Sequence, residues 1–110
     1  MELTISGRHL EVTEAMQSHI RQHLQKLHRY NDQIQAVSVT LHRDAGSEEA
    51  EVRAKCRKSL LVATARSHDM YRSIEQAFER LERQVARLHE KLVSRSKPHR
   101  GGGPQEEQAP

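Results

Sequence analysis

The sequence predicts an α+β domain with the order β-α-β-β-β-α, in which a four-stranded mixed sheet carries two helices packed on one face. Three observations predict this class. Four stretches alternate apolar and polar residues, two others repeat apolar residues every three or four positions, and every stretch has a single apolar face. Elements with one apolar face become stable when they pack in two layers. The 110 residues suit one such domain.

The first strand and the first helix occupy the N-terminal third of the chain. Residues 2–8 are expected to form the strand, because Leu3 and Ile5 alternate with polar residues, and Gly7 is expected to end it. Thr13 is a suitable N-cap for the helix that follows. The apolar stripe of this helix has helical spacing and consists of Met16, Ile20, Leu24 and Leu27, with Tyr30 at its edge and a turn at Asn31 and Asp32.

Three more strands follow the first helix. Alternation returns over residues 34–43, again from Ala50, and once more around Leu61. Turn-forming residues separate these stretches at 44–47 and at Lys58–Ser59. The short turns predict an antiparallel meander for the last three strands. The helical crossover between the first two strands predicts that they are parallel if they are neighbours.

The second helix is predicted to be the longer one, with Asp69 as its N-cap and its end near Val93. The following residues are rich in Gly, Pro and Gln, which predicts a disordered tail. We therefore divide the chain into a folded domain, 1–95, and a tail, 96–110. The apolar stripe of this helix consists of Met70, Ile74, Ala77, Phe78, Leu81, Val85, Leu88 and Leu92.

Charge is distributed unevenly along the chain. The net charge is +3, but residues 53–95 hold eleven Lys or Arg against five acidic residues, whereas residues 1–52 are net acidic. On the second helix the two signs occupy separate flanks. An arginine-rich row about 28 Å long can follow a phosphate backbone, because guanidinium groups bind phosphate oxygens in pairs. The basic flank holds Arg72, Gln76, Arg80, Arg83, Arg87 and Lys91, and the acidic flank holds Glu75, Glu79, Glu82 and Glu90.

Two further basic patches are candidates for the same partner. One lies on the outward side of the third strand, and the other at the end of the first helix, where its residues could equally serve only to complement the helix dipole. No aromatic residue interleaves with the basic residues, so we expect contacts to the phosphates and shape of a folded RNA. The strand patch is Arg53, Lys55 and Arg57 with Lys58, and the helix patch is Lys26 and Arg29.

Several segments carry a family resemblance that extends from residue 2 to about residue 93. They are Gly7 followed by Leu10-Glu11-Val12-Thr13-Glu14-Ala15, then Lys26-Leu27 and Tyr30, then Asp69-Met70-Tyr71 with Ile74-Glu75, and finally Arg80, Arg83-Gln84, Arg87 and Lys91-Leu92. In these segments the chain resembles the short form of the ribosome hibernation promoting factor / protein Y family, whose members are also described as sigma-54 modulation proteins.

The resemblance implies a factor of stress or stationary phase that binds the small (30S) ribosomal subunit, alone or within whole 70S ribosomes. It would contact 16S rRNA in the decoding region, block the messenger and transfer RNA sites, and inhibit translation. The family's rRNA-contacting positions correspond here to Lys26, Arg80, Arg83, Arg87 and Lys91. His23 and His89 stand where the family commonly has Lys, so both would gain charge on mild acidification. We expect a monomer away from the ribosome.

Two alternatives stay open: a general double-stranded RNA-binding module, and a protein that modulates an alternative sigma factor. We expect no enzyme, cofactor, metal or small-molecule substrate. The glutamates of the second helix lie on an exposed flank, His19 and His23 lack further ligands at a recognisable spacing, and Cys56 falls on the inward face of a strand as a buried thiol. A single cysteine and the lack of a long apolar run suit a cytoplasmic protein without membrane contact or targeting segment.

Overall fold

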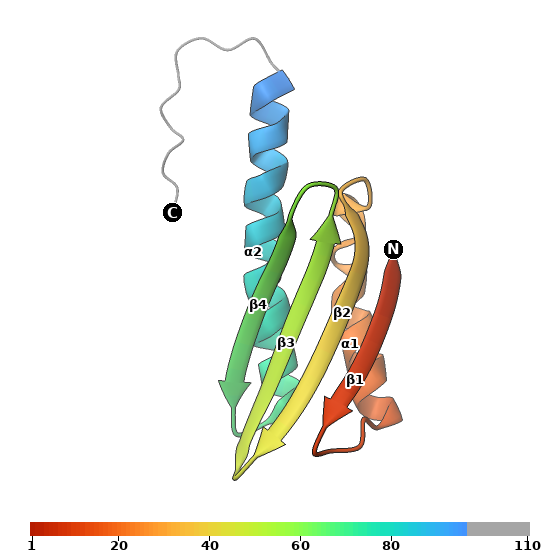
Figure 1. Cartoon of the computed structure of the whole chain (residues 1–110), viewed down its shortest axis with the longest axis vertical. Helices are drawn as coiled ribbons and strands as arrows, with labels where there is room; N and C mark the ends of the chain where they lie inside the picture. The colour runs from red at the N-terminus through yellow and green to blue at the C-terminus, as the bar shows by residue number, and fades with distance from the viewer. Residues whose placement is uncertain (97–110) are drawn as a thin grey trace.

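The order of secondary-structure elements is β-α-β-β-β-α, as the periodicity predicts (Figure 1). The computed structural model describes residues 1–96, and side chains as far as Lys91. A short 3-10 helix, η1, follows the first α-helix. The elements are β1 (Glu2–Arg8), α1 (Glu14–Gln25), η1 (His28–Tyr30), β2 (Ile34–Asp44), β3 (Ser47–Cys56), β4 (Leu60–Ser67) and α2 (Met70–Ser96).

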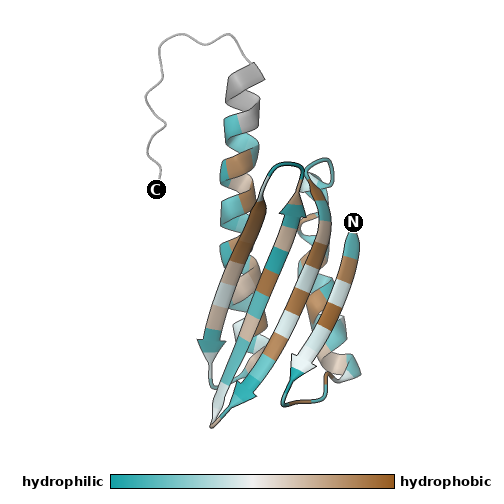
Figure 2. Cartoon of the chain, viewed as in Figure 1, coloured by the Kyte–Doolittle hydropathy of each residue, from teal (hydrophilic) through white to brown (hydrophobic). Residues whose placement is uncertain are grey.

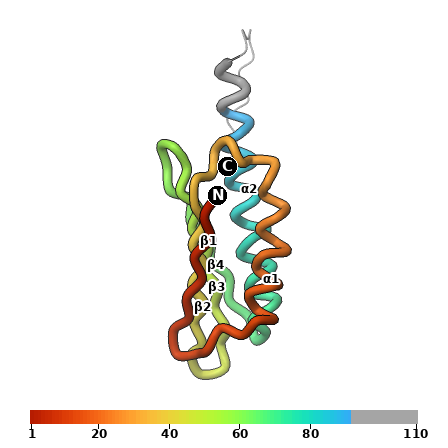
Figure 3. Tube along the Cα trace, turned by 90° about the vertical axis from the view of Figure 1, so that its right-hand side faces the viewer, coloured from red at the N-terminus to blue at the C-terminus, as the bar shows by residue number. Residues whose placement is uncertain are grey.

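The four strands form one mixed sheet in the order β1-β2-β3-β4. β1 runs parallel to β2, with Ile5 opposite Val39, and the other neighbours are antiparallel. Both helices lie on the same face of the sheet (Figure 3). α2 packs mainly on β3 and β4, and α1 packs against α2. The predicted architecture is therefore confirmed. Within residues 1–96, no element covers the opposite face of the sheet.

The core lies between the sheet and the two helices. Apolar and polar residues alternate along β2 and β3, so that one set faces the helices (Figure 2). Small residues on β3 and β4 allow α2 to approach the sheet closely. The buried sheet residues include Val37, Val39, Leu41, Ala50, Val52, Ala54, Cys56, Ala63 and Ala65, and the helices contribute Met16, Ile20, Met70, Ile74, Ala77, Phe78, Leu81 and Val85.

The prediction that Gly7 ends the first strand is wrong. Gly7 lies inside β1, opposite Leu41, and the strand continues to Arg8. A Cβ atom at this position would lie 2.8 Å from the carbonyl oxygen of Leu10 and 2.9 Å from Cγ2 of Val12. Glycine is therefore required because the connection to α1 folds back against the strand, which leaves no room for a side chain.

The first helix is shorter than its apolar stripe suggests. α1 ends at Gln25, and Leu27 and Tyr30 belong to η1 or its start, where both are buried. The 3-10 turn brings them inward after the α-helical spacing has ended, so Tyr30 is a core residue and not an edge residue. At the start of α1, Thr13 Oγ1 accepts a hydrogen bond from the Met16 N–H at 3.1 Å, which confirms the predicted cap.

The turn between β2 and β3 is tighter than the four-residue stretch in the sequence indicates. Asp44 pairs with Ser47, which leaves a two-residue loop of Ala45 and Gly46, with φ angles of 47° and 82°. Two consecutive positive φ angles suit the right-handed twist of a β-hairpin. β3 consequently begins at Ser47, before the alternation from Ala50.

The second helix begins as predicted and ends later than predicted. Asp69 Oδ1 accepts a hydrogen bond from the Tyr71 N–H at 3.0 Å, and α2 continues past Val93 to Ser96. The predicted tail lies outside the described residues from position 97 onward, and so does the side chain of Leu92. None of the helices within residues 1–96 has the length and apolarity needed to cross a membrane.

Candidate nucleic-acid interface

The basic flank of α2 lies along the exposed edge of β4. Arg80 of this flank and the neighbouring Gln84 reach the backbone of that strand. The Arg80 guanidinium donates from Nη1 to the Thr64 carbonyl oxygen at 2.5 Å, and the Gln84 amide donates from Nε2 to the Val62 carbonyl oxygen at 2.9 Å. Residues four apart on a helix share a face, and residues two apart on a strand point the same way. Arg80 and Gln84, four apart on α2, can therefore bond to two carbonyl oxygens that lie two residues apart on the same edge of β4.

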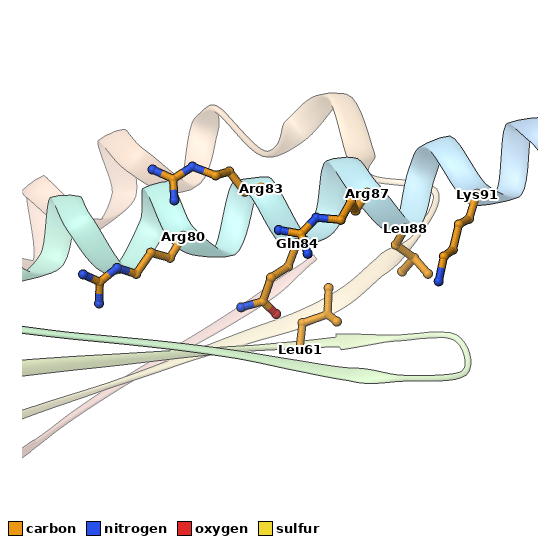
Figure 4. A pocket seen from close by; sticks show the side chains of 7 residues that line it. All are labelled: Leu61, Arg80, Arg83, Gln84, Arg87, Leu88 and Lys91. Carbon is orange, nitrogen blue, oxygen red and sulfur yellow. The ribbon is translucent and has the colours of Figure 1, made fainter. Parts of the chain in front are cut away.

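A groove of about 640 Å³ runs between α2 and the beginning of β4. Its sides carry the positive charges of α2, while Leu61 and Leu88 contribute an apolar floor (Figure 4). The exposed apolar residues of β4, Leu60 and Val62, lie next to it along the strand. The residues that line the groove are Leu61, Arg80, Arg83, Gln84, Arg87, Leu88 and Lys91.

The fold brings the ends of the three predicted basic patches to one end of the molecule. Ile34, just after η1, pairs with Cys56 at the end of β3, so Arg29 and Arg57 flank the same end of the sheet. The Gln33 side chain donates from Nε2 to His89 Nδ1 at 2.6 Å, which ties η1 to the later turns of α2. The start of β2, the β3–β4 turn and the second half of α2 lie at the same end in Figure 1.

The patches do not form one flat surface. All nine predicted contact residues are exposed. The α2 row and the α1 patch lie on the helical side of the sheet, whereas Arg53 and Lys55 lie on its uncovered face. Arg53 pairs there with Glu51 at 3.4 Å, and the guanidinium of Arg29 lies 5.3 Å from the centroid of the Tyr30 ring. A single nucleic-acid strand lying on the α2 row would not reach Arg53 and Lys55.

The positive charges of α2 have no carboxylate partner among the described side chains. The ion pairs between residues 1 and 91 all belong to β2, β3 and β4, and the strongest geometry is the Arg43–Glu48 pair at 2.8 Å. Hydrogen bonding to Glu48 raises the pKa of Arg43. No ion pair among the described side chains therefore offsets the mutual repulsion within the α2 row, and a polyanion would relieve that repulsion.

The acidic flank of α2 faces α1 and a cluster of histidines. The His23 ring stacks on Phe78 with centroids 5.9 Å apart, and His19 lies edge-on to it at 4.7 Å. Burial, and secondarily the positive charges of His19 and Lys26, lower the pKa of His23, while Glu75 and Glu79 partly oppose this. Protonation of His23 therefore requires a lower pH than that of a free imidazole.

Sequence reasoning missed the residues that give the groove its shape. Leu61 and Leu88 were assigned only to apolar stripes, yet both are partly exposed and border the basic row. Gln84 appeared only within the family resemblance. The available signal was the apolar run Leu60–Leu61–Val62 in an edge strand, combined with Gln84 and Leu88 spaced four apart on the helix.

Other candidate chemistry in the described part of the chain has a structural explanation. No three His, Cys, Asp or Glu side chains between residues 1 and 91 are grouped closely enough to hold a metal ion. His19 Nε2 lies 3.2 Å from the Tyr71 carbonyl oxygen, a hydrogen bond that fastens α1 to α2. Cys56 is buried, as predicted, and burial raises the pKa of its thiol, which disfavours the reactive thiolate.

The fold is a small domain with two helices on one face of a mixed sheet, and its basic row has no carboxylate partner among the described side chains. Comparison with known proteins narrows the class. Residues 3–93 match the family described as "Sigma 54 modulation protein / S30EA ribosomal protein". The chain belongs to this family.

Relatives and solved structures agree with that assignment. A ribosome hibernation promoting factor of Azotobacter vinelandii is 29% identical over 100 residues, which cover 91% of this chain and 94% of the relative. The ribosome-associated factor Y of Haemophilus influenzae is 30% identical over 95 residues, covering 86% and 89%. The crystal structure of the Thermus thermophilus Protein Y N-terminal domain superposes with a TM-score of 0.74 and 30% identity, over 80% of this chain and 99% of that domain.

Proposed function

We propose that this protein is a non-catalytic ribosome hibernation factor that binds the 30S subunit through 16S rRNA in the decoding region. There it would occupy the messenger and transfer RNA sites and inhibit translation under stress or in stationary phase. It would bind 70S ribosomes in the same way, and it would act in the cytoplasm, where ribosomes are. Membership of the family supports the ribosomal partner, and the names of the relatives support hibernation.

The observation that carries the proposal is the row of exposed Arg80, Arg83, Arg87 and Lys91 without carboxylate partners among the described side chains. The turns of α2 space these charges along the helix axis, and the groove beside them keeps them accessible. Lys26, Arg29 and Arg57 lie at the same end of the domain as the later part of the row and would supply secondary phosphate contacts. Arg53 and Lys55 would reach a separate segment of the rRNA from the uncovered face.

Charge reversal of the row tests the proposal. The variant with Arg80→Glu, Arg83→Glu and Arg87→Glu should fail to co-sediment with small subunits on a sucrose gradient, whereas the parent protein moves with them and is displaced by transfer RNA. Each phosphate contact in the parent protein should add roughly one unit to the slope of log affinity against log salt.

A matched control carries the same change in net charge at other places, with Arg8→Glu, Arg21→Glu and Arg66→Glu. This control should retain most of the binding, because its positions lie outside the row. Since Arg80 also bonds to β4, a second variant with Arg83→Glu, Arg87→Glu and Lys91→Glu separates lost binding from lost packing. Co-sedimentation of both row variants at the level of the parent protein would contradict the proposed surface.

A further inference from the structure

We infer that the groove between α2 and β4 is a subsite for a single unpaired nucleotide, with the base on the apolar floor and its phosphates on the arginine rim. This inference rests on the proposed function, because the nucleotide would belong to the RNA that the basic row binds. It adds that the surface selects RNA with a base outside the stack, and does not merely attract phosphates.

The apolar floor is the first reason. A surface that only attracts phosphates needs basic residues and no exposed apolar ones. This groove is nevertheless lined by Leu61 and Leu88, which are both partly exposed. In Figure 4 these two side chains lie in the space between helix and strand, flanked by Arg87 and Lys91. Apolar contact with the face of a base, with a guanidinium plane able to cover it, is a common way to hold an unstacked nucleotide.

The orientation of Gln84 is the second reason. Its Nε2 donates to the Val62 carbonyl oxygen at 2.9 Å, so the amide is held in place and its Oε1 is directed away from that bond. An amide oxygen is a hydrogen-bond acceptor only. A base in the groove would therefore be recognised by a donor on its edge, such as the exocyclic amino group of adenine or cytosine. A phosphate would be repelled by this oxygen.

The size of the groove is the third reason. Its volume of about 640 Å³ lies within the range of roughly 300–1,000 Å³ that holds small molecules. In a regular A-form duplex the base faces are stacked on each other and cannot enter such a site. Arg83, on the outer side of the groove, is then placed to contact the phosphates that flank the extruded nucleotide.

Three RNA stems test the inference. One is fully paired, one carries a single unpaired adenosine, and one carries an abasic sugar at the same place, so that flexibility and base recognition are separated. Fluorescence anisotropy at fixed salt measures each affinity. The parent protein should bind the stem with the unpaired adenosine about tenfold more tightly than the other two, which corresponds to about 1.4 kcal/mol.

Variants assign the preference to the groove. Gln84→Leu and Leu88→Ala should reduce the tenfold ratio to near one. The ratio is the readout, because an equal change in affinity for all three stems leaves it unaltered. Gln76→Leu is the matched control, because Gln76 lies on the same flank outside the groove and should keep the ratio. Thermal melting checks that each variant is folded. Equal affinity of the parent protein for all three stems overturns the inference, and so does a ratio that survives in Gln84→Leu.

Failure of the subsite and failure of the proposed function give different results. If the protein sediments with small subunits but binds all stems equally, only the subsite is wrong. If neither small subunits nor stems are bound, the proposed function fails, and the inference with it. If subunits are bound but no stem is, Gln84→Leu must weaken subunit binding several-fold relative to Gln76→Leu, and equal binding by these two variants overturns the inference.

Discussion

The two flanks of α2 carry opposite charges and meet opposite surroundings. On the flank toward β4, Arg80 and Gln84 donate hydrogen bonds to the strand, and Arg83, Arg87 and Lys91 are exposed. The flank toward α1 faces a second helix, where Glu75 and Glu79 lie near the half-buried ring of His23. Glu75 and Glu79 thus lie near a titratable group of α1, whereas the basic row has no carboxylate partner among the described side chains.

This difference shows which charges belong to the fold and which are available to a partner. A helix made only to be soluble would intersperse its signs, since favourable pairs three or four residues apart add stability. Here the separation gives up most of those pairs and concentrates positive potential on one side. The comparison also ranks the experiments, because changes on the open flank should affect binding most and changes on the α1 flank should affect it least.

After charge reversal, the largest effects are expected when Arg80 and Arg83 are replaced separately and the two single variants are compared in binding and in stability. Arg80→Met removes both a phosphate-binding group and the hydrogen bond to the Thr64 carbonyl, so it should weaken ribosome binding and also lower the free energy of unfolding by about 1 kcal/mol. Arg83→Met should weaken binding to a similar extent but change the free energy of unfolding by less than about 0.5 kcal/mol. Urea denaturation and gradient sedimentation measure the two effects. Equal stability losses would mean that the bond to β4 contributes nothing.

A smaller effect is expected from the acidic flank. Replacing Glu75 and Glu79 with Gln removes two negative charges within about one Debye length of the basic row, so affinity for the ribosome should rise about two- to threefold at low salt and less at high salt. The same change should lower the pKa of His23 further, because both glutamates raise it. An NMR titration of the His23 ring detects this shift. An unchanged or higher His23 pKa would show that the two glutamates do not act on the ring.

The smallest effect concerns pH. Because the pKa of His23 is lower in the folded protein than the ordinary 6.5, the unfolded chain binds more protons between the two values. This residue therefore costs no stability above pH 6.5, and it destabilises the protein increasingly as the pH falls through 6.5 toward the lower, folded-state pKa. His23→Gln should remove that part of the pH dependence, seen as a difference in Tm below about 4 °C because the ring is only partly buried. Melting curves at pH 7.5 and 5.5 measure it. An equal fall in Tm for both proteins would exclude His23 as the cause.

The sequence predicted the parts of the molecule that follow from local periodicity. The stripe of α1 as far as Leu24, the stripe of α2 as far as Leu88, the alternation of β2 to β4 and the caps at Thr13 and Asp69 depend on neighbours a few residues away. The structure confirms these parts of the prediction. The sign split of α2 was predictable for the same reason, since it requires only the helical repeat.

Most features that escaped prediction depend on contacts between distant segments. The lowered pKa of His23 follows from its burial in the packing of α1 on α2, where the ring stacks on Phe78. Gly7 is different: its contacts, Leu10 and Val12, are near in sequence, but they arise from a reversal of the chain that has no periodic pattern. The groove exists because α2 lies along the edge of β4 beside Leu61. No local sequence pattern predicts where along β4 the helix lies. The assignment of the nine basic residues to rRNA stays a prediction, for which exposure is necessary but not sufficient.

The hydrogen bonds from Arg80 and Gln84 to β4 also protect this edge of the sheet against pairing with another copy of the chain. An outermost strand offers unpaired backbone groups that can recruit strands from other chains and start aggregation. Here two side chains of α2 already occupy the Thr64 and Val62 carbonyls, beside the exposed Leu60 and Val62, where such recruitment would be most damaging. The residues proposed to bind RNA thus also block two backbone acceptors of the edge strand, which disfavours aggregation through that edge.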